Sequence, residues 1–251
     1  MPLGVFDSGV GGLTVFRELI RAFPDTDIIY IGDTARVPYG GRSQEIIVQY
    51  ALELARYLTE NYHTDLLIAA CNTISSYALP AIEGELGIPA LGVIEPGAQS
   101  AVKLTKNNRI GVIGTSATVT SGAYKQAVAR ISKETEVFQA ACPLLVPLVE
   151  EGLLDGEIPR LVLKMYIEPI AEKGIDTLIL GCTHYPLLAP LIRELYPNMA
   201  VTDSAENIIS HVEAKKESGL RVIATTDTGG AAESLKTKLV GGIPITKVFL
   251  S

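Results

Sequence analysis

Two of the three cysteines stand in matching sequence contexts. Cys71 ends the segment Asp65–Cys71, which reads DLLIAAC, and Cys182 ends the segment Asp176–Cys182, which reads DTLILGC. In each segment an aspartate begins a short apolar run and the cysteine follows it by six positions. Such runs are typical of strands buried on both faces of a parallel sheet. The pattern therefore predicts two thiols at equivalent strand ends.

A thiol pair of this kind suits the inversion of a stereocentre next to a carboxylate. One group removes a proton from one face of the carbon and a second group returns a proton to the other face. One cysteine would act as the thiolate base and the other as the thiol acid, with the roles exchanged in the reverse direction. A helix beginning after each strand would lower the pKa of each thiol. A lone cysteine in an apolar run is more often a packing residue, but the matched pair favours chemistry.

The strands upstream of the two cysteines match as well. Gly4–Ser8 reads GVFDS and Gly111–Thr115 reads GVIGT, and they precede Cys71 and Cys182 by 67 and 71 residues. Two matches in the same order indicate a duplicated βα lobe, with a boundary near Glu95 and a last segment that returns to the first lobe. The predicted lobes are residues 1–95 with 206–251, and residues 96–205.

The third cysteine and the histidines do not suggest a metal or disulfide framework. Cys142 precedes Pro143 in an apolar stretch and is expected to pack in the core. Three widely spaced cysteines without a CxxC pair argue against structural disulfides and against a thioredoxin-like redox pair. His63, His184 and His211 form no HxxxH pair, so no metal site is expected.

Short apolar runs alternate with amphipathic stretches along the whole chain, which predicts an α/β fold with mostly parallel sheets. Helices are expected at Ser43–Glu60, Glu157–Lys173 and Ser204–Glu217, the last with Ser204 as its N-cap and Gly219 just past its end. Strands are expected at Leu3–Asp7, Asp27–Ile31, Asp65–Ala70, Pro89–Ile94, Arg109–Gly114, Glu136–Ala140, Thr177–Gly181, Ala200–Thr202, Leu220–Ala224 and Thr246–Phe249.

Polar residues follow several of these strands. Because ligands of parallel sheets sit outside the carboxyl ends of the strands, these residues are candidates for a binding site. The glycine-rich turn after the first strand fits neither a dinucleotide fingerprint nor a Walker A sequence, but its N–H groups could bind an anion. Two of the candidates, Tyr39 and Gly40, are expected in an exposed loop. The others are Asp7, Ser8, Asn72, Thr73, Thr115, Thr118, Thr183 and His184.

Composition limits the class of protein. The 251 residues are 47% hydrophobic and 20% charged, with a net charge of −7 and a pI near 5.1. No basic run supports nucleic-acid binding, and no apolar run approaches the roughly 18 residues of a membrane span. The first basic residue is Arg17, so a secretory signal is not expected and a cytoplasmic location is.

Several long motifs, in the same order, resemble glutamate racemases of the aspartate/glutamate racemase superfamily. The resemblance covers nearly the whole chain. It is carried by Phe6–Thr14 (FDSGVGGLT), Gly32–Gly40 (GDTARVPYG), Cys71–Thr73 (CNT), Gly111–Thr115 (GVIGT) and Gly181–Pro186 (GCTHYP).

The resemblance implies two flavodoxin-like lobes, related by a pseudo-twofold axis, with the active site in the cleft. Cys71 and Cys182 would be the acid/base pair, assisted by Asp7 and His184 and more weakly by Glu150. Ser8, Tyr39, Gly40, Asn72, Thr73, Thr183 and His184 would bind glutamate. The family needs no cofactor or metal, is usually homodimeric, and supplies D-glutamate for peptidoglycan synthesis.

Three other functions remain open from the sequence. A racemase for aspartate or another acidic amino acid would use the same chemistry in a pocket of different size. A non-catalytic two-lobed binding protein would explain the repeat but not the paired cysteines, and a thiol redox protein would need the cysteines within bonding distance.

Ile74 departs from the small residue that the superfamily often has there, so we expect it to alter packing in the cleft.

Overall fold

The predicted apolar runs form the strands of two parallel sheets. The computed structural model describes residues 2–228, 237 and 239–250. All ten predicted strands are present among these residues, with ends shifted by at most two positions. They are β1 (Leu3–Asp7), β2 (Ile28–Gly32), β3 (Leu66–Ala69), β4 (Ala90–Gly92), β5 (Arg109–Gly114), β6 (Glu136–Ala141), β7 (Thr177–Gly181), β8 (Ala200–Asp203), β9 (Arg221–Thr225) and β10 (Ile245–Lys247).

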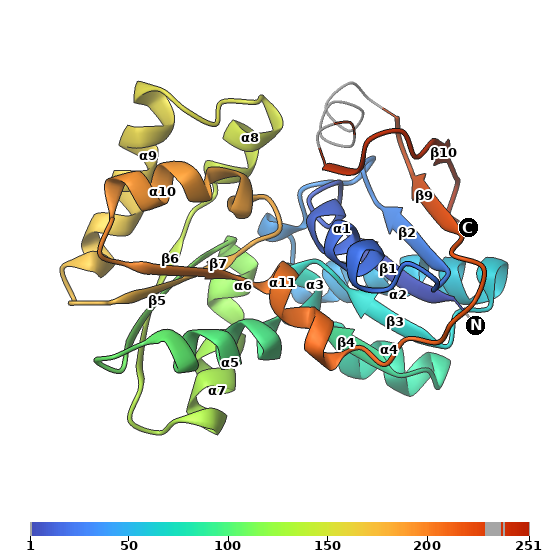
Figure 1. The fold of residues 1–251 in the computed structure, drawn as a ribbon, viewed down its shortest axis with the longest axis horizontal. Coiled ribbons are helices and arrows are strands. Elements are labelled where there is room, and N and C mark those ends of the chain that lie inside the picture. Colours follow the sequence, from blue (N-terminus) through green and yellow to red (C-terminus); the bar gives the residue numbers. More distant parts are fainter. Residues whose placement is uncertain (1, 229–236, 238, 251) are drawn as a thin grey trace.

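The two sheets define two lobes (Figure 1). The first lobe is built on the order β10-β9-β2-β1-β3-β4 and the second on the order β6-β5-β7-β8. Every strand pair described is parallel. The order β2-β1-β3-β4 in the first lobe is the same as β6-β5-β7-β8 in the second, which supports the predicted duplication. The expected α/β class with mostly parallel sheets is confirmed, and the described sheets are parallel throughout.

Helices cover both faces of each sheet. In chain order they are α1 (Leu13–Ala22), α2 (Gln44–Tyr62), α3 (Asn72–Ser75), α4 (Leu79–Leu86), α5 (Ile94–Leu104), α6 (Ser116–Ser121), α7 (Ala123–Ile131), α8 (Leu145–Glu150), α9 (Glu157–Ala171), α10 (Ala189–Leu195) and α11 (Ser204–Asn207), with the 3₁₀ turns η1 (Tyr39–Gly41), η2 (Tyr185–Leu188) and η3 (Ile208–His211). No helix among the described residues is both long enough and apolar enough to cross a membrane.

The core of the first lobe shows why these segments take these forms. Phe16 and Leu19, three residues apart on α1, pack on one face of the sheet together with Val5 of β1. Leu54 and Leu58, four apart on α2, pack on the other face. A helical spacing of three or four puts side chains on one face, so each helix buries a single stripe. The second lobe has the same arrangement, with separate core clusters on the two faces of its sheet.

One predicted helix is wrong over most of its length. The helix expected at Ser204–Glu217 ends as α11 and η3 at His211, and the chain then runs without regular structure to β9. Tertiary contacts replace the missing helical hydrogen bonds: Thr26 donates its hydroxyl to the carbonyl of Lys215, and Glu217 donates its N–H to the carbonyl of Asp25. The proposed N-cap side chain of Ser204 lies outside the described residues.

Candidate active site

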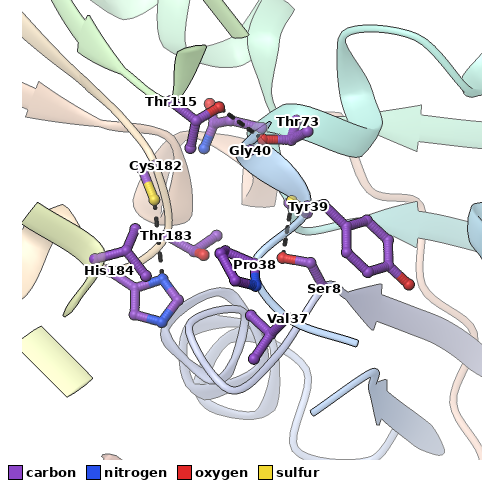
Figure 2. A pocket seen from close by; sticks show the side chains of 13 residues that line it. Ser8, Val37, Pro38, Tyr39, Gly40, Thr73, Thr115, Cys182, Thr183 and His184 are labelled. Carbon is purple, nitrogen blue, oxygen red and sulfur yellow. Dashed lines mark hydrogen bonds between the residues drawn. The ribbon is translucent and has the colours of Figure 1, made fainter. Parts of the chain in front are cut away.

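A small pocket lies where the carboxyl ends of strands from the two lobes face each other (Figure 2). Its volume is about 20 Å³, which is enough for about one water molecule. The first lobe supplies one wall and the second lobe the other. The lining residues are Ser8, Val37, Pro38, Tyr39, Gly40, Cys71, Asn72, Thr73, Thr115, Val146, Cys182, Thr183 and His184.

Cys71 follows β3 and lies at the N-terminal end of α3, as expected. Its side chain is buried, and its Sγ lies 3.4 Å from the Ser8 hydroxyl. Burial, together with the nearby charge of Asp7, raises the pKa of the Cys71 thiol to about 12. The expectation that a helix terminus would lower this pKa is therefore wrong, because α3 has only four residues and loss of solvent outweighs its field.

Cys182 follows β7 on the opposite wall and has a histidine as its partner. The Nδ1 of His184 lies 3.8 Å from the Cys182 Sγ, and its Nε2 lies 3.4 Å from Glu150 Oε1 at the end of α8. The alignment to Glu150 is too poor for a hydrogen bond, so this contact is an ion pair. Burial alone would lower the pKa of His184, but Cys182, Glu150 and Asp7 raise it to about 10.

Asp7 is fully buried at the end of β1, behind the pocket wall and not in it. Its Oδ2 accepts a hydrogen bond of 2.9 Å from the Gly9 N–H, and its Oδ1 accepts one of 3.4 Å from the Thr183 hydroxyl of the second lobe. Burial raises the pKa of Asp7, although the charge of His184 and these hydrogen bonds oppose the rise. The glycine-rich turn thus directs at least one N–H inward to Asp7.

Gly11 and Gly40 allow the two lobes to approach closely. A Cβ on Gly11 would overlap the Thr183 hydroxyl, and a Cβ on Gly40 would lie 2.5 Å from the Cβ of Thr115. Both positions therefore require a residue without a side chain in this closed arrangement.

Three threonine hydroxyls join the lobes at the upper edge of the pocket. Thr73 Oγ1 lies 2.9 Å from Thr115 Oγ1 and 3.4 Å from Thr118 Oγ1, and the Thr115 hydroxyl donates to Thr118 over 3.0 Å. Thr73 and Thr115 line the pocket, whereas Thr118 lies behind them and holds Thr115 in place. The structure brings all three predicted hydroxyls together.

The predicted exposure of Tyr39 is wrong. Its ring is buried, and its hydroxyl points away from Cys182 and His184 (Figure 2). The hydroxyl donates to the buried carboxylate of Asp33, which also accepts from Arg36 at 2.5 Å and from the Thr226 hydroxyl at 2.8 Å. Tyr39 therefore lines the pocket with its ring, and its hydroxyl anchors the loop.

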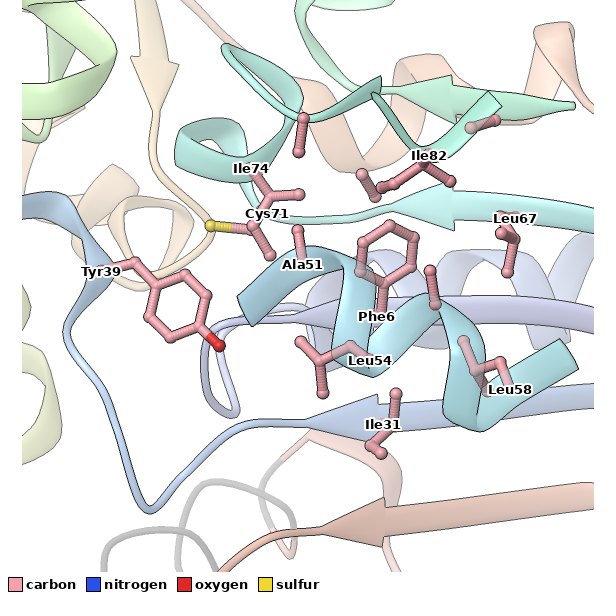
Figure 3. Packing of buried hydrophobic residues seen from close by; sticks show 14 of the residues in the cluster. Phe6, Ile31, Tyr39, Ala51, Leu54, Leu58, Leu67, Cys71, Ile74 and Ile82 are labelled. Carbon is pink, nitrogen blue, oxygen red and sulfur yellow. The ribbon is translucent and has the colours of Figure 1, made fainter. Parts of the chain in front are cut away.

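Ile74 does not itself line the pocket. It is fully buried and packs in the first-lobe core beside Cys71 (Figure 3). Cys142 is also fully buried and packs in the second-lobe core, as predicted.

Several residues of the site were missed in the sequence. Val37, Pro38 and Val146 line the pocket, and Tyr124 of α7 donates a hydrogen bond of 2.7 Å to Asn72 Oδ1. Tyr124 belongs to the opposite lobe from Asn72, so no local pattern could have identified it. Glu150 reaches the site only through His184.

Comparisons with known proteins identify the family of this chain. A family model described as Asp/Glu/Hydantoin racemase matches residues 4–212. The chain belongs to this family. The glutamate racemases of Sulfurihydrogenibium sp. and Persephonella marina are 51% and 52% identical to it, each over 100% of this chain and 98% of the relative. The resemblance seen in the motifs is thus confirmed.

Solved structures show the same fold. A glutamate racemase isoform from Bacillus anthracis matches with a TM-score of 0.91 and 38% identity, covering 99% of this chain and 97% of that one. The Francisella tularensis glutamate racemase in complex with D-glutamate matches with a TM-score of 0.90 and 32% identity. That match covers 100% of this chain and 98% of the other. An aspartate racemase homologue from Pyrococcus horikoshii, at 19% identity and a TM-score of 0.59, covers 84% of this chain and 96% of that one and shares the fold alone.

Proposed function

We propose that this chain is a glutamate racemase, an isomerase that interconverts L-glutamate and D-glutamate by proton transfer to and from two cysteines. The observation that carries the proposal is the placement of Cys71 and Cys182 on opposite walls of one pocket. Inversion needs two acid/base groups on opposite faces of a carbon, and the two lobes supply one each.

The surroundings of the two thiols suit different roles. With its pKa near 12, Cys71 carries its proton at neutral pH. His184, with a pKa near 10, is an imidazolium at neutral pH and lies next to Cys182. Cys71 thus supplies the acid on the first-lobe wall, and we assign the base to Cys182 on the second-lobe wall. This state suits attack on L-glutamate by Cys182, the direction that the family resemblance also implies.

The proton balance closes without another reactant. The Cα–H bond of L-glutamate breaks as a Cys182 S–H bond forms, and the electron pair spreads into the α-carboxylate. The Cys71 S–H bond then breaks as a new Cα–H bond forms on the opposite face. The product is D-glutamate, and the enzyme now holds a Cys71 thiolate, ready for the reverse reaction. The His184 imidazolium stays beside Cys182 through these steps, with the Glu150 side chain next to it.

Polar groups around the thiols suit the substrate's two carboxylates and its ammonium. We assign this binding to Ser8, Gly40, Asn72, Thr73, Thr115 and Thr183 together with His184, with Thr118 behind Thr115. Tyr39 contributes its ring, because its hydroxyl is engaged by Asp33. Glutamate is favoured over aspartate because relatives at about half identity are named glutamate racemases, while the aspartate racemase homologue shares only the fold.

The proposal needs no cofactor, since the thiols and their neighbours supply every acid and base that inversion requires. From the family resemblance we further propose a homodimer in the cytoplasm whose D-glutamate enters peptidoglycan synthesis.

The direct test is to incubate the purified protein with L-glutamate or with D-glutamate, without added cofactor, and to follow optical rotation or circular dichroism. Both enantiomers are expected to approach the racemic mixture, and L-aspartate is expected to react far more slowly. Conversion of aspartate but not glutamate would favour an aspartate racemase. If neither amino acid is converted, the non-catalytic two-lobed binding protein is the favoured alternative.

Variants of the three cysteines separate chemistry from packing. Cys71→Ala and Cys182→Ala are each expected to abolish racemisation, whereas Cys142→Ala is expected to keep it, since its thiol lies in the core. Activity retained in either of the first two variants would contradict the two-thiol mechanism.

A further inference from the structure

Tyr124 makes a buried hydrogen bond that crosses from one lobe to the wall of the pocket in the other. It is the second residue of α7 in the second lobe, is fully buried, and donates to Asn72 Oδ1 over 2.7 Å. Asn72 is itself 1% exposed, lines the pocket, and directly follows Cys71 as the first residue of α3. A phenol that is not in the pocket thus contacts the segment that carries the first-lobe thiol.

The surroundings of Tyr124 restrict where its hydroxyl can go. A Cβ on Gly97 of α5 would lie 3.2 Å from this hydroxyl, and a Cβ on Gly181 would lie 3.1 Å from the ring. The ring therefore occupies a narrow slot between two glycines, one of which immediately precedes Cys182. In this close packing the hydroxyl reaches Asn72.

From this geometry we infer that Tyr124 is a positioning residue. It holds Asn72, and through it the Cys71–Thr73 segment, in a fixed position relative to the second lobe. The inference rests on the proposed racemase function. Removing the hydroxyl takes away a buried hydrogen bond that ties Asn72 to the second lobe, so the Asn72 side chain and its segment are held less firmly. A small displacement is enough to lower a proton-transfer rate strongly.

The test compares Tyr124→Phe with Tyr77→Phe. Both remove one hydroxyl that crosses between the lobes, but the Tyr77 hydroxyl donates over 3.0 Å to the carbonyl of Ala117, which does not line the pocket. We expect Tyr124→Phe to lower kcat/KM for glutamate about tenfold and Tyr77→Phe to leave it within about twofold. Equal losses in the two variants would mean that Tyr124 only helps to join the lobes, and would overturn the inference.

A double-mutant cycle shows whether Tyr124 acts through Asn72. If it does, adding Tyr124→Phe to Asn72→Ala changes kcat/KM much less than adding it to the wild type. A further tenfold loss in the Asn72→Ala background would overturn the inference. Melting temperatures of all variants show whether each remains folded. An inactive wild type would instead count against the proposed function, whereas an active wild type with a fully active Tyr124→Phe counts only against this inference.

Discussion

At the scale of single residues, the two cysteines differ because their nearest partners differ. Cys71 has a neutral hydroxyl at 3.4 Å and a buried carboxyl group nearby, both of which suit a protonated thiol. Cys182 has a histidine whose pKa is near 10. In the proposed mechanism, the mirror-image substrate and product are therefore handled by two thiols in different surroundings, with a proton on Cys71 and an imidazolium beside Cys182.

The raised pKa of His184 predicts that kcat/KM depends on pH through the charge of this ring. A folded pKa raised above its usual 6.5 keeps the ring charged from neutral pH up to about 10, and the charge is lost above that. We expect wild-type kcat/KM to fall as the pH rises through about 10. His184→Gln should lower kcat/KM at pH 8 about tenfold to a hundredfold and remove that alkaline decline.

The matched control is His211→Gln, because the His211 ring contacts Gln99 and Asn207 away from the pocket. It should leave both the rate and the pH profile unchanged. The same alkaline limb in wild type and His184→Gln would show that another group is responsible.

At the scale of elements, the duplicated aspartates before β3 and β7 have diverged in their contacts. Asp176 accepts hydrogen bonds from the Thr105 hydroxyl and from the N–H groups of Lys106 and Asn107, and so ties the end of α5 to β7. Asp65 instead pairs with the exposed Lys215 at 2.6 Å. Burial would raise the pKa of Asp176, but the hydrogen bonds outweigh it and lower the pKa.

The divergence predicts unequal stability effects. Asp176→Asn should lower the free energy of unfolding at pH 7 by about 1–3 kcal/mol, and Asp65→Asn by less than about 1 kcal/mol. Because the folded pKa of Asp176 is depressed, its contribution is present above the usual pKa of 3.8 and is lost as the pH falls below it. Urea denaturation at pH 7 and at pH 3 measures both effects, and equal losses in the two variants would contradict the assignment.

The strands were predictable from the sequence because most are apolar runs, and those at the centre of the sheets, such as β1, β2 and β7, are buried along their whole length. The segment after His211 was not, because its hydrogen bonds go to Asp25, Thr26 and Asp27 far away in the chain. The cysteine pair was predictable from the repeat. The burial of Tyr39 was not, since it depends on Asp33 and on contacts that form only in the folded lobe.

At the scale of the whole molecule, the pocket is too small for its proposed substrate. A volume of about 20 Å³ holds about one water molecule, so the lobes must separate to admit an amino acid and then close around it. Gly40 and Gly11 are the points at which side chains would prevent this close approach.

Closure can be tested with two adjacent glycines. Gly40→Ala places a methyl group against Thr115 of the opposite lobe, whereas a Cβ on Gly41 would meet nothing within 4 Å. We expect Gly40→Ala to lower kcat/KM about tenfold to a hundredfold with little change in melting temperature, and Gly41→Ala to leave kinetics unchanged. Full activity in Gly40→Ala would mean that the lobes need not approach this closely.

The central claim is that two bases act on opposite faces of one carbon, and the early course of reaction in deuterated water tests it most directly. Each thiol exchanges its hydrogen with solvent, so the thiol that protonates the product delivers deuterium, while unreacted substrate keeps its original hydrogen. In the first part of the reaction, deuterium at Cα is expected in D-glutamate formed from L-glutamate and in L-glutamate formed from D-glutamate, and not in the recovered substrate. Deuterium appearing equally fast in substrate and product would indicate a single base serving both faces and would contradict this account.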